Sequence, residues 1–240
     1  MARQWTNCAR VLLVRPDTRQ KSVGKDLDDL LTRVGVKIAD REWAIWCVEN
    51  QDVLLSLMSA DDDAPYGLLL WESAVALAQE LEQQPQLVAG RRVLELGAGV
   101  GLPGLVARRL GARVHQTDKA EDALRVAARN ERENGLSGIE RFLADWTHWT
   151  HAERYDVIIG ADIFYETDMH SALATIVERS IAPHGRVLVA DPGRPQTIAF
   201  LSALEDKGVR FDLTVRCVPP TCPLGSGEEV EVLLCTWTPS

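Results

Sequence analysis

"VLELGAGVGLPG", residues Val93 to Gly104, is the stretch that decides the fold. It holds four glycines and one proline within twelve residues, directly after an apolar run and directly before a helix-like segment. A strand, a glycine turn and a helix in this order let a ligand contact backbone N–H groups at the start of the helix. Gly99, Gly101 and Gly104 also match the dinucleotide pattern GxGxxG, which is a weak signal by itself. The stretch therefore predicts a ligand site at the edge of a sheet.

Strand-like and helix-like segments alternate after this stretch. "RVHQTD" (113–118), "RYDVIIGAD" (154–162) and "GRVLVAD" (185–191) are strand-like, and apolar residues at helical spacing follow each of them. This alternation predicts an α/β fold with a doubly wound sheet. "RFDLTVRCV" (210–218) and "EEVEVLLCTW" (228–237) have no helical pattern between them, so they predict a terminal antiparallel hairpin.

The first sixty or so residues are less regular. "REWAIWCVEN" (41–50) and "DVLLSLM" (52–58), with a polar turn at Gln51 and Asp52, predict a small antiparallel hairpin. "SADDDAPYG" (59–67) is a connector, and a helix that begins near Trp71 should then cover the sheet. We expect a small β-containing extension over residues 1–63 and the α/β domain over residues 64–240.

Composition narrows the class of protein. A chain of 240 residues, 46% of them hydrophobic, is long enough to bury a full core. Its apolar runs are far shorter than the roughly 18 residues of a membrane span, and the N-terminus lacks a signal-peptide core, so we expect a cytoplasmic protein with no membrane partner. The net charge of -9 argues against a nucleic-acid partner. Five cysteines without CxxC spacing indicate reduced thiols and no zinc site.

Acidic residues near the glycines point to a particular ligand. A turn that binds a pyrophosphate is best free of negative charge, whereas Glu95, two residues before Gly97, favours a ligand with an ammonium or a sulfonium group. Asp118 ends the next strand, where it can hold ribose hydroxyls. Asp145 and Trp146 follow the third strand, where they can contact an adenine amino group and ring. These residues predict S-adenosylmethionine as the cofactor.

A structural alternative stays open for each of these residues. The glycines can form a tight turn without a ligand, Asp118 can cap a helix, and Trp146 can be a core residue. An NAD-dependent oxidoreductase or a non-catalytic nucleotide-binding module would also keep the glycines. Neither would need "ADW" (144–146) followed by "DIFY" (162–165).

Several motifs resemble one enzyme family. They are "PYGLLLWESAVALAQEL" (65–81), "VLELGAGVGLPGL" (93–105), "TD" (117–118), "ADW" (144–146) and "GADIFYE" (160–166). They resemble the seven-β-strand methyltransferases grouped as methyltransferase family 16, which includes protein lysine methyltransferases, and the resemblance covers residues 65–238. "DPGRPQ" (191–196) is similar to the branch that methylates lysines of the electron-transfer flavoprotein β-subunit. The resemblance implies a seven-stranded Rossmann-like sheet.

The resemblance also implies roles for individual positions. Trp71 would lie beside the cofactor, the glycine loop would wrap its methionine portion, Asp118 would hold the ribose, Trp146 would flank the adenine, and Ala161 would close the site. The full set of predicted cofactor-binding residues is Trp71, Glu95, Gly97, Ala98, Gly99, Gly101, Asp118, Asp145, Trp146 and Ala161.

The predicted acceptor residues are Asp162 and Tyr165, which form the D-x-x-Y motif after the fourth strand. A lysine acceptor with a pKa of about 10.4 must lose a proton before transfer, which costs roughly 4 to 5 kcal/mol at pH 7. Asp162 can orient the amine by a hydrogen bond, and Tyr165 offers an aromatic face and a hydroxyl. The alternative makes Asp162 a strand-end cap and Tyr165 a packed aromatic residue.

The expected reaction is methyl transfer from S-adenosylmethionine to a lysine side chain of a protein. A small-molecule N- or O-methyltransferase is the alternative, because it would share every cofactor residue and differ only in its acceptor pocket. No NPPY or DPPY sequence is present, which disfavours a DNA-base acceptor. His115, His148 and His151 have no companion at metal-ligand spacing, so we expect structural histidines and no metal.

Overall fold

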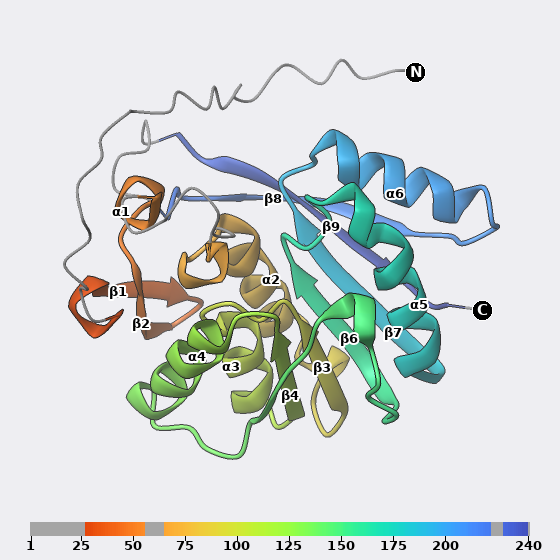
Figure 1. Ribbon diagram of the computed structural model, residues 1–240. Coiled ribbons are helices and arrows are strands. Elements are labelled where there is room, and N and C mark those ends of the chain that lie inside the picture. Colours follow the sequence, from red (N-terminus) through yellow and green to blue (C-terminus); the bar gives the residue numbers. More distant parts are fainter. Residues whose placement is uncertain (1–26, 56–64, 222–227, 240) are drawn as a thin grey trace.

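The computed structural model describes residues 27–55, 65–221 and 228–239 (Figure 1). A seven-stranded sheet forms the centre, in the order β5-β4-β3-β6-β7-β9-β8, and β1 (Leu31–Ile38) and β2 (Arg41–Val48) form a separate two-stranded sheet. The central strands are β3 (Arg92–Leu96), β4 (Arg113–Asp118), β5 (Glu140–Leu143), β6 (Tyr155–Ala161), β7 (Ile181–Asp191), β8 (Asp212–Val218) and β9 (Val230–Trp237). The predicted doubly wound sheet is confirmed.

Helices cover both faces of this sheet (Figure 1). One face carries α2 (Glu72–Gln83), α3 (Leu102–Arg109) and α4 (Glu121–Glu133), and the other carries α5 (His170–Ser180) and α6 (Pro195–Glu205). Successive strand residues point to opposite faces, so Val93 packs into the first core and Leu94 into the second. Because both faces are buried, β6 and β7 carry continuous apolar runs, at residues 157–159 and 187–190.

The predicted terminal hairpin is also confirmed. β8 and β9 pair antiparallel from Asp212 opposite Thr236 to Val218 opposite Val230. β9 lies between β8 and β7 and is antiparallel to β7 as well, whereas β3 to β7 pair in parallel.

The N-terminal hairpin and its predicted strand over residues 41–50 exist, but the predicted partner strand over residues 52–58 was wrong. β2 (Arg41–Val48) pairs with the preceding segment β1 (Leu31–Ile38), and residues 51–55 begin a short helix, α1 (Gln51–Leu55). The carboxamide oxygen of Asn50 accepts a hydrogen bond from the backbone N–H of Val53, which caps a helix start and ends the strand. The rest of the predicted second strand, residues 56–58, and the predicted domain boundary after residue 63 lie outside the described residues.

Two asparagines of α4 hold this hairpin against the main domain. The carboxamide of Asn130 bonds both the N–H and the C=O of Trp46, at 2.7 and 3.1 Å, and that of Asn134 bonds the N–H and the C=O of Ala44, at 3.0 and 2.8 Å. A side-chain amide offers the same donor and acceptor as a peptide unit. The two side chains therefore continue the edge of β2 as a neighbouring strand would. Asn130 also donates to the C=O of Val100 in the glycine loop, at 2.9 Å.

Within the described ranges, no helix combines the length and the apolar character that crossing a membrane requires.

Candidate active site

A cavity opens at the carboxyl ends of β3, β4 and β6. Strand order reverses between β3 and β6, and open α/β sheets bind ligands at such a reversal. Of the described residues, every predicted site residue except Gly101 lines this cavity. The lining set is Trp71, Glu95, Gly97, Ala98, Gly99, Asp118, Asp145, Trp146, Ala161, Asp162 and Tyr165.

The glycine loop packs against Gly67, a residue of the segment that the sequence predicted as a connector. At Gly99, with φ +53°, an added Cβ would lie 3.0 Å from the carbonyl oxygen of Gly67. Gly67 belongs to a short 3₁₀ turn, η2 (Tyr66–Leu68), and the indole Nε1 of Trp71 donates to the C=O of Tyr66 at 3.1 Å. Trp71 thus fixes the turn that covers the loop.

Gly101 lies at the start of α3, behind the described lining of the cavity. It begins α3 in the left-handed conformation, with φ +88°, and a Cβ there would lie 2.9 Å from the Cβ of Ala127. Its carbonyl accepts a hydrogen bond from Gln116 at 3.1 Å. Gly101 therefore lets α3 and α4 pack closely behind the cavity.

Asp118 links the glycine loop to the start of α4. One carboxylate oxygen accepts the N–H of Gly99 and the other accepts the N–H of Ala120, both at 2.9 Å. Burial raises the pKa of the Asp118 carboxyl, and these two N–H bonds oppose that rise. A carboxylate has about four acceptor sites, so the Asp118 carboxylate keeps acceptor capacity for a ligand hydroxyl beside its backbone N–H bonds.

Glu95 lines the floor of the cavity, but its carboxylate is already engaged. It is 2% exposed and accepts a hydrogen bond from Nε2 of Gln116 at 2.7 Å. A Cβ on Gly104 would lie 2.3 Å from the same carboxylate oxygen, so the side chain is packed against the first turn of α3. Burial raises the pKa of the Glu95 carboxyl to about 7.

Asp145 and Trp146 lie at one side of the cavity, at the start of η4 (Trp146–His148). Oδ1 of Asp145 accepts the N–H of Thr147 at 2.8 Å and its hydroxyl at 2.7 Å, and these bonds lower the pKa of the Asp145 carboxyl. Among the described residues, Nε1 of Trp146 is buried and has no hydrogen-bond partner. A buried donor without a partner indicates a ligand acceptor at this position.

Asp162 follows β6 in a strained conformation and is 9% exposed. Its φ of +58° is rare for a residue other than glycine, and such strain concentrates at functional sites. The guanidinium of Arg194 donates two hydrogen bonds to its carboxylate, from Nη1 to Oδ1 and from Nη2 to Oδ2. Burial raises the pKa of the Asp162 carboxyl, and Arg194 limits the rise.

Arg194 was not predicted as a site residue, although it lies in the quoted motif "DPGRPQ". Its backbone N–H donates to Oδ1 of Asp191 at 3.0 Å, and its Nη1 lies 3.5 Å from Oδ2 of the same residue. The pair joins the ends of β6 and β7 across 32 residues of sequence. The signal for Arg194 in the sequence is an arginine shortly after the aspartate that ends a strand. Its contact with Asp162 depends on the fold.

Tyr165 lines the same end of the cavity as Asp162 and is 37% exposed. Burial raises the pKa of its hydroxyl to about 12, and the neighbouring carboxylate of Glu166 adds to the rise. The hydroxyl therefore keeps its proton at neutral pH and is a hydrogen-bond donor to whatever enters this end.

Two of the three histidines lie close together in the structure, which the sequence did not predict. His148 is exposed and contacts Thr147, but His115 and His151 both contact the hydroxyl of Tyr155, at 2.8 and 2.6 Å. Their sequence separation of 36 residues hid this proximity.

Comparisons with known proteins agree with this geometry. The family model for lysine methyltransferases matches residues 49–207. Histone-arginine methyltransferase METTL23 of Mus musculus is 36% identical over 118 residues, which are 46% of this chain and 47% of that protein. The electron transfer flavoprotein beta subunit lysine methyltransferase of Mus musculus is 32% identical over 134 residues, 55% of this chain and 52% of that protein. The chain thus spans about half the length of the curated relatives it matches.

Solved structures show the same fold. The tRNA (uracil-54, C5)-methyltransferase of Pyrococcus abyssi, in complex with S-adenosyl-L-homocysteine, has a TM-score of 0.55 at 20% identity and covers 86% of this chain and 44% of that chain. The ribosomal protein L11 methylase of Lactobacillus delbrueckii subsp. bulgaricus has a TM-score of 0.53 at 18% identity, covering 70% and 79%. Their fold is the Rossmann-like methyltransferase fold. The resemblance found in the motifs is confirmed, because the family model covers well over half of the residues: this chain belongs to the lysine methyltransferase family.

Proposed function

We propose that this chain transfers a methyl group from S-adenosylmethionine to the side-chain nitrogen of a lysine in a protein substrate. One observation carries the proposal: the strained, buried Asp162 and the hydroxyl of Tyr165 line the same cavity as the glycine loop and Asp118. Membership of the lysine methyltransferase family supports the same reaction.

The residues of the cavity fit this cofactor. The Asp118 carboxylate keeps acceptor capacity for a ribose hydroxyl beside its backbone N–H bonds. The unpartnered Nε1 of Trp146 is a free donor at the proposed adenine side. Gly97 and Gly99 let the loop pack closely against Ile163 and Gly67, because an added Cβ would lie 2.9 and 3.0 Å from atoms of these residues. When bound, S-adenosylmethionine supplies an electrophilic methyl group on a positive sulfur.

The chain's own contribution is alignment of the acceptor. Asp162 attracts the cationic acceptor and then accepts an N–H bond that orients the nitrogen, and Tyr165 limits its approach. An in-line displacement depends chiefly on such alignment, and a misplaced nucleophile loses several kcal/mol of it.

Calorimetry tests the cofactor half of the proposal. S-adenosylmethionine and its demethylated product should bind at micromolar affinity, and NAD should not. Asp118→Ala should weaken the cofactor by about 1.5 to 3 kcal/mol, because bonds between a charged group and hydroxyls are lost. Tight NAD binding without a response to S-adenosylmethionine would overturn the proposal.

Substitutions at the acceptor end test the chemical half. Asp162→Asn should leave cofactor affinity within a few fold and lower turnover by roughly 10² or more at saturating cofactor. Tyr165→Phe, beside Tyr165→Ala, separates the hydroxyl from the ring. Melting temperature is measured beside the rate, because Asp162 follows a buried strand. Wild-type turnover in a stably folded Asp162→Asn protein removes Asp162 from the mechanism.

An arginine acceptor is the second candidate. Asp162 already holds the planar guanidinium of Arg194 through two N–H···O bonds, so its carboxylate has the geometry that an arginine acceptor needs. A relative that the chain partly matches is named as a histone-arginine methyltransferase. Labelled S-adenosylmethionine, incubated with cell lysate and this protein, distinguishes the candidates. Mass spectrometry of the labelled protein identifies methyl-lysine or methyl-arginine, and label in the small-molecule fraction alone contradicts both.

Three further expectations from the sequence belong to this proposal. They are a cytoplasmic location, no nucleic-acid partner, and a division into an extension over residues 1–63 and a methyltransferase domain over residues 64–240. We also infer that the extension contacts the protein substrate, because Asn130 joins the N-terminal hairpin to the glycine loop that lines the cavity.

A further inference from the structure

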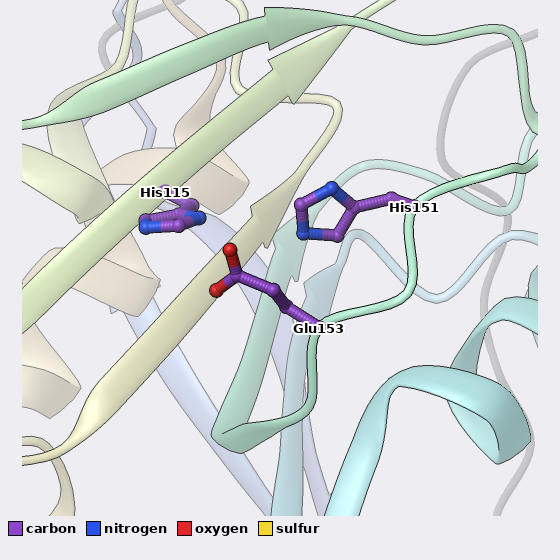
Figure 2. A group of neighbouring side chains, drawn as sticks. All are labelled: His115, His151 and Glu153. Carbon is purple, nitrogen blue, oxygen red and sulfur yellow. The ribbon is translucent and has the colours of Figure 1, made fainter.

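A second group of side chains with metal-ligand chemistry lies outside the cofactor cavity. His115 comes from β4, and His151 and Glu153 come from the segment between η4 and β6. One ligand atom from each lies within 4.8 Å of the others, and Figure 2 shows the two rings and the carboxylate turned toward one another. The lining of the cofactor cavity, as far as the chain is described, includes none of the three.

Neighbouring rings fix the two imidazoles in place. Phe142 stacks on His151 with a centroid distance of 4.4 Å and an angle of 15°, and Trp149 meets the same ring edge-on at 5.9 Å. Tyr155 packs edge-on against His115 at 5.4 Å. Rings that cannot rotate away are oriented in advance, as ligands of a metal must be.

The hydroxyl of Tyr155 shows how the two ring nitrogens face a common centre. It lies 2.6 Å from Nε2 of His151 and 2.8 Å from Nδ1 of His115, and the tyrosine is 1% exposed. The hydroxyl has a single hydrogen, so it can donate to only one of these nitrogens. The other imidazole donates its own N–H to the hydroxyl oxygen, so a cation bound by both nitrogens takes the place of both of these hydrogen bonds.

A carboxylate lies near the remaining nitrogen of His115, beyond hydrogen-bond distance. Oε2 of Glu140 lies 3.6 Å from Nε2 of His115, whereas Nδ1 faces Tyr155. A histidine that binds a metal through one nitrogen typically directs the other N–H at a carboxylate, which fixes the tautomer. Two imidazoles and one carboxylate, with a position left for water, are a donor set that zinc and similar first-row dications favour over magnesium or calcium.

We propose that His115, His151 and Glu153 form a binding site for a zinc-type divalent cation that fastens the segment before β6 to β4. The same segment begins with Asp145 and Trp146, which line the cofactor cavity. The site does not depend on the proposed methyl transfer, so either can fail alone.

Zinc titration against a chromophoric chelator tests the proposal on the full chain after dialysis with EDTA. The wild-type protein should bind one zinc per chain at this site. His151→Gln and His115→Gln should each weaken it by more than the about 10- to 100-fold that loss of an outer-shell partner costs. His148→Gln is the matched control, because this histidine is exposed and lies three residues before His151 in the same segment. It should bind zinc as the wild type does.

Glu153→Gln keeps the test decisive if a histidine variant is unstable, because Glu153 is exposed and its loss leaves packing intact. It should also weaken zinc, and zinc should raise the melting temperature of the wild type and of His148→Gln more than that of Glu153→Gln. Equal zinc affinity in the wild type, Glu153→Gln and a folded His151→Gln protein would overturn the site, as would a wild type that binds no zinc.

Discussion

Asp162 meets a guanidinium within the folded protein itself, before any acceptor arrives. Arg194 offsets the cost of burying this carboxylate and opposes the rise that burial gives to the pKa of Asp162. An acceptor cation must therefore compete with Arg194, or bind beside it, for the same carboxylate.

Removing Arg194 should move the acid limb of the rate profile. In Arg194→Gln the pKa of Asp162 rises further, so the carboxylate is protonated at higher pH than in the wild type. We expect the acid limb of kcat to move to higher pH. Arg194→Lys keeps the charge without the two-pronged grip and should show a smaller displacement. A profile of kcat against pH in Arg194→Gln that overlays the wild type would show that Asp162 does not need this partner.

Glu95 makes the stability of the fold depend on pH. Its pKa is about 7 in the folded protein against an ordinary 4.5, so the folded state binds the proton more tightly than the unfolded chain. The resulting stabilisation is fully present below about pH 4.5 and is lost as pH rises through about 7. Its full size is about 3 kcal/mol.

Glu95→Gln should remove this dependence, because the amide resembles the protonated acid and does not ionise. At pH 8 the variant should unfold with a higher free energy than the wild type, and at pH 4.5 the two should be similar. Urea unfolding at both pH values measures the difference. An identical pH dependence in the two proteins would mean that Glu95 is not the group responsible.

The glycine loop and the η2 turn act together as one element of the site. Gly99→Ala should cost about 1 to 2 kcal/mol for its left-handed backbone and should also push Gly67 away from the cavity. Gly90→Ala is the matched control, because Gly90 has φ +73° with no atom near the position of an added Cβ. Both variants should lose stability, but only Gly99→Ala should weaken S-adenosylmethionine in calorimetry. Equal cofactor affinity in both would separate the η2 turn from cofactor binding.

The elements that could be predicted from the sequence are those whose signals are local. The strand, glycine loop and α3 follow one another within residues 92–109, and β8 and β9 alternate in an antiparallel tail, so both could be predicted. The hairpin strands were mistaken because Gln51 and Asp52 look like a turn, whereas Asn50 uses its side chain to begin a helix. The contact of Arg194 with Asp162 and that of His115 with His151 depend on tertiary packing, which no local pattern encodes.

At the scale of the whole molecule, Asn130 ties the N-terminal hairpin to the glycine loop. It is fully buried and bonds Trp46 of β2 and Val100 of the loop, whereas Asn134 bonds the hairpin at Ala44 and leaves the loop alone. Asn130→Ala and Asn134→Ala should each destabilise the fold by roughly 1 to 3 kcal/mol. Only Asn130→Ala should also weaken the cofactor. Chemical unfolding and calorimetry on the two variants check this, and equal cofactor affinities would mean that the hairpin and the loop are independent.

The reversal of strand order between β3 and β6 divides the cavity lining into two parts. The lining residues from Pro65 to Trp146 come before β6 in the chain, and those from Ala161 to Met169 come from its end onward. The two parts of the lining therefore lie on separate stretches of sequence. A substitution after β6 can reshape the acceptor end without replacing a residue of the glycine loop or Asp118. The proposed acceptor end can therefore change during evolution while the proposed cofactor site is kept.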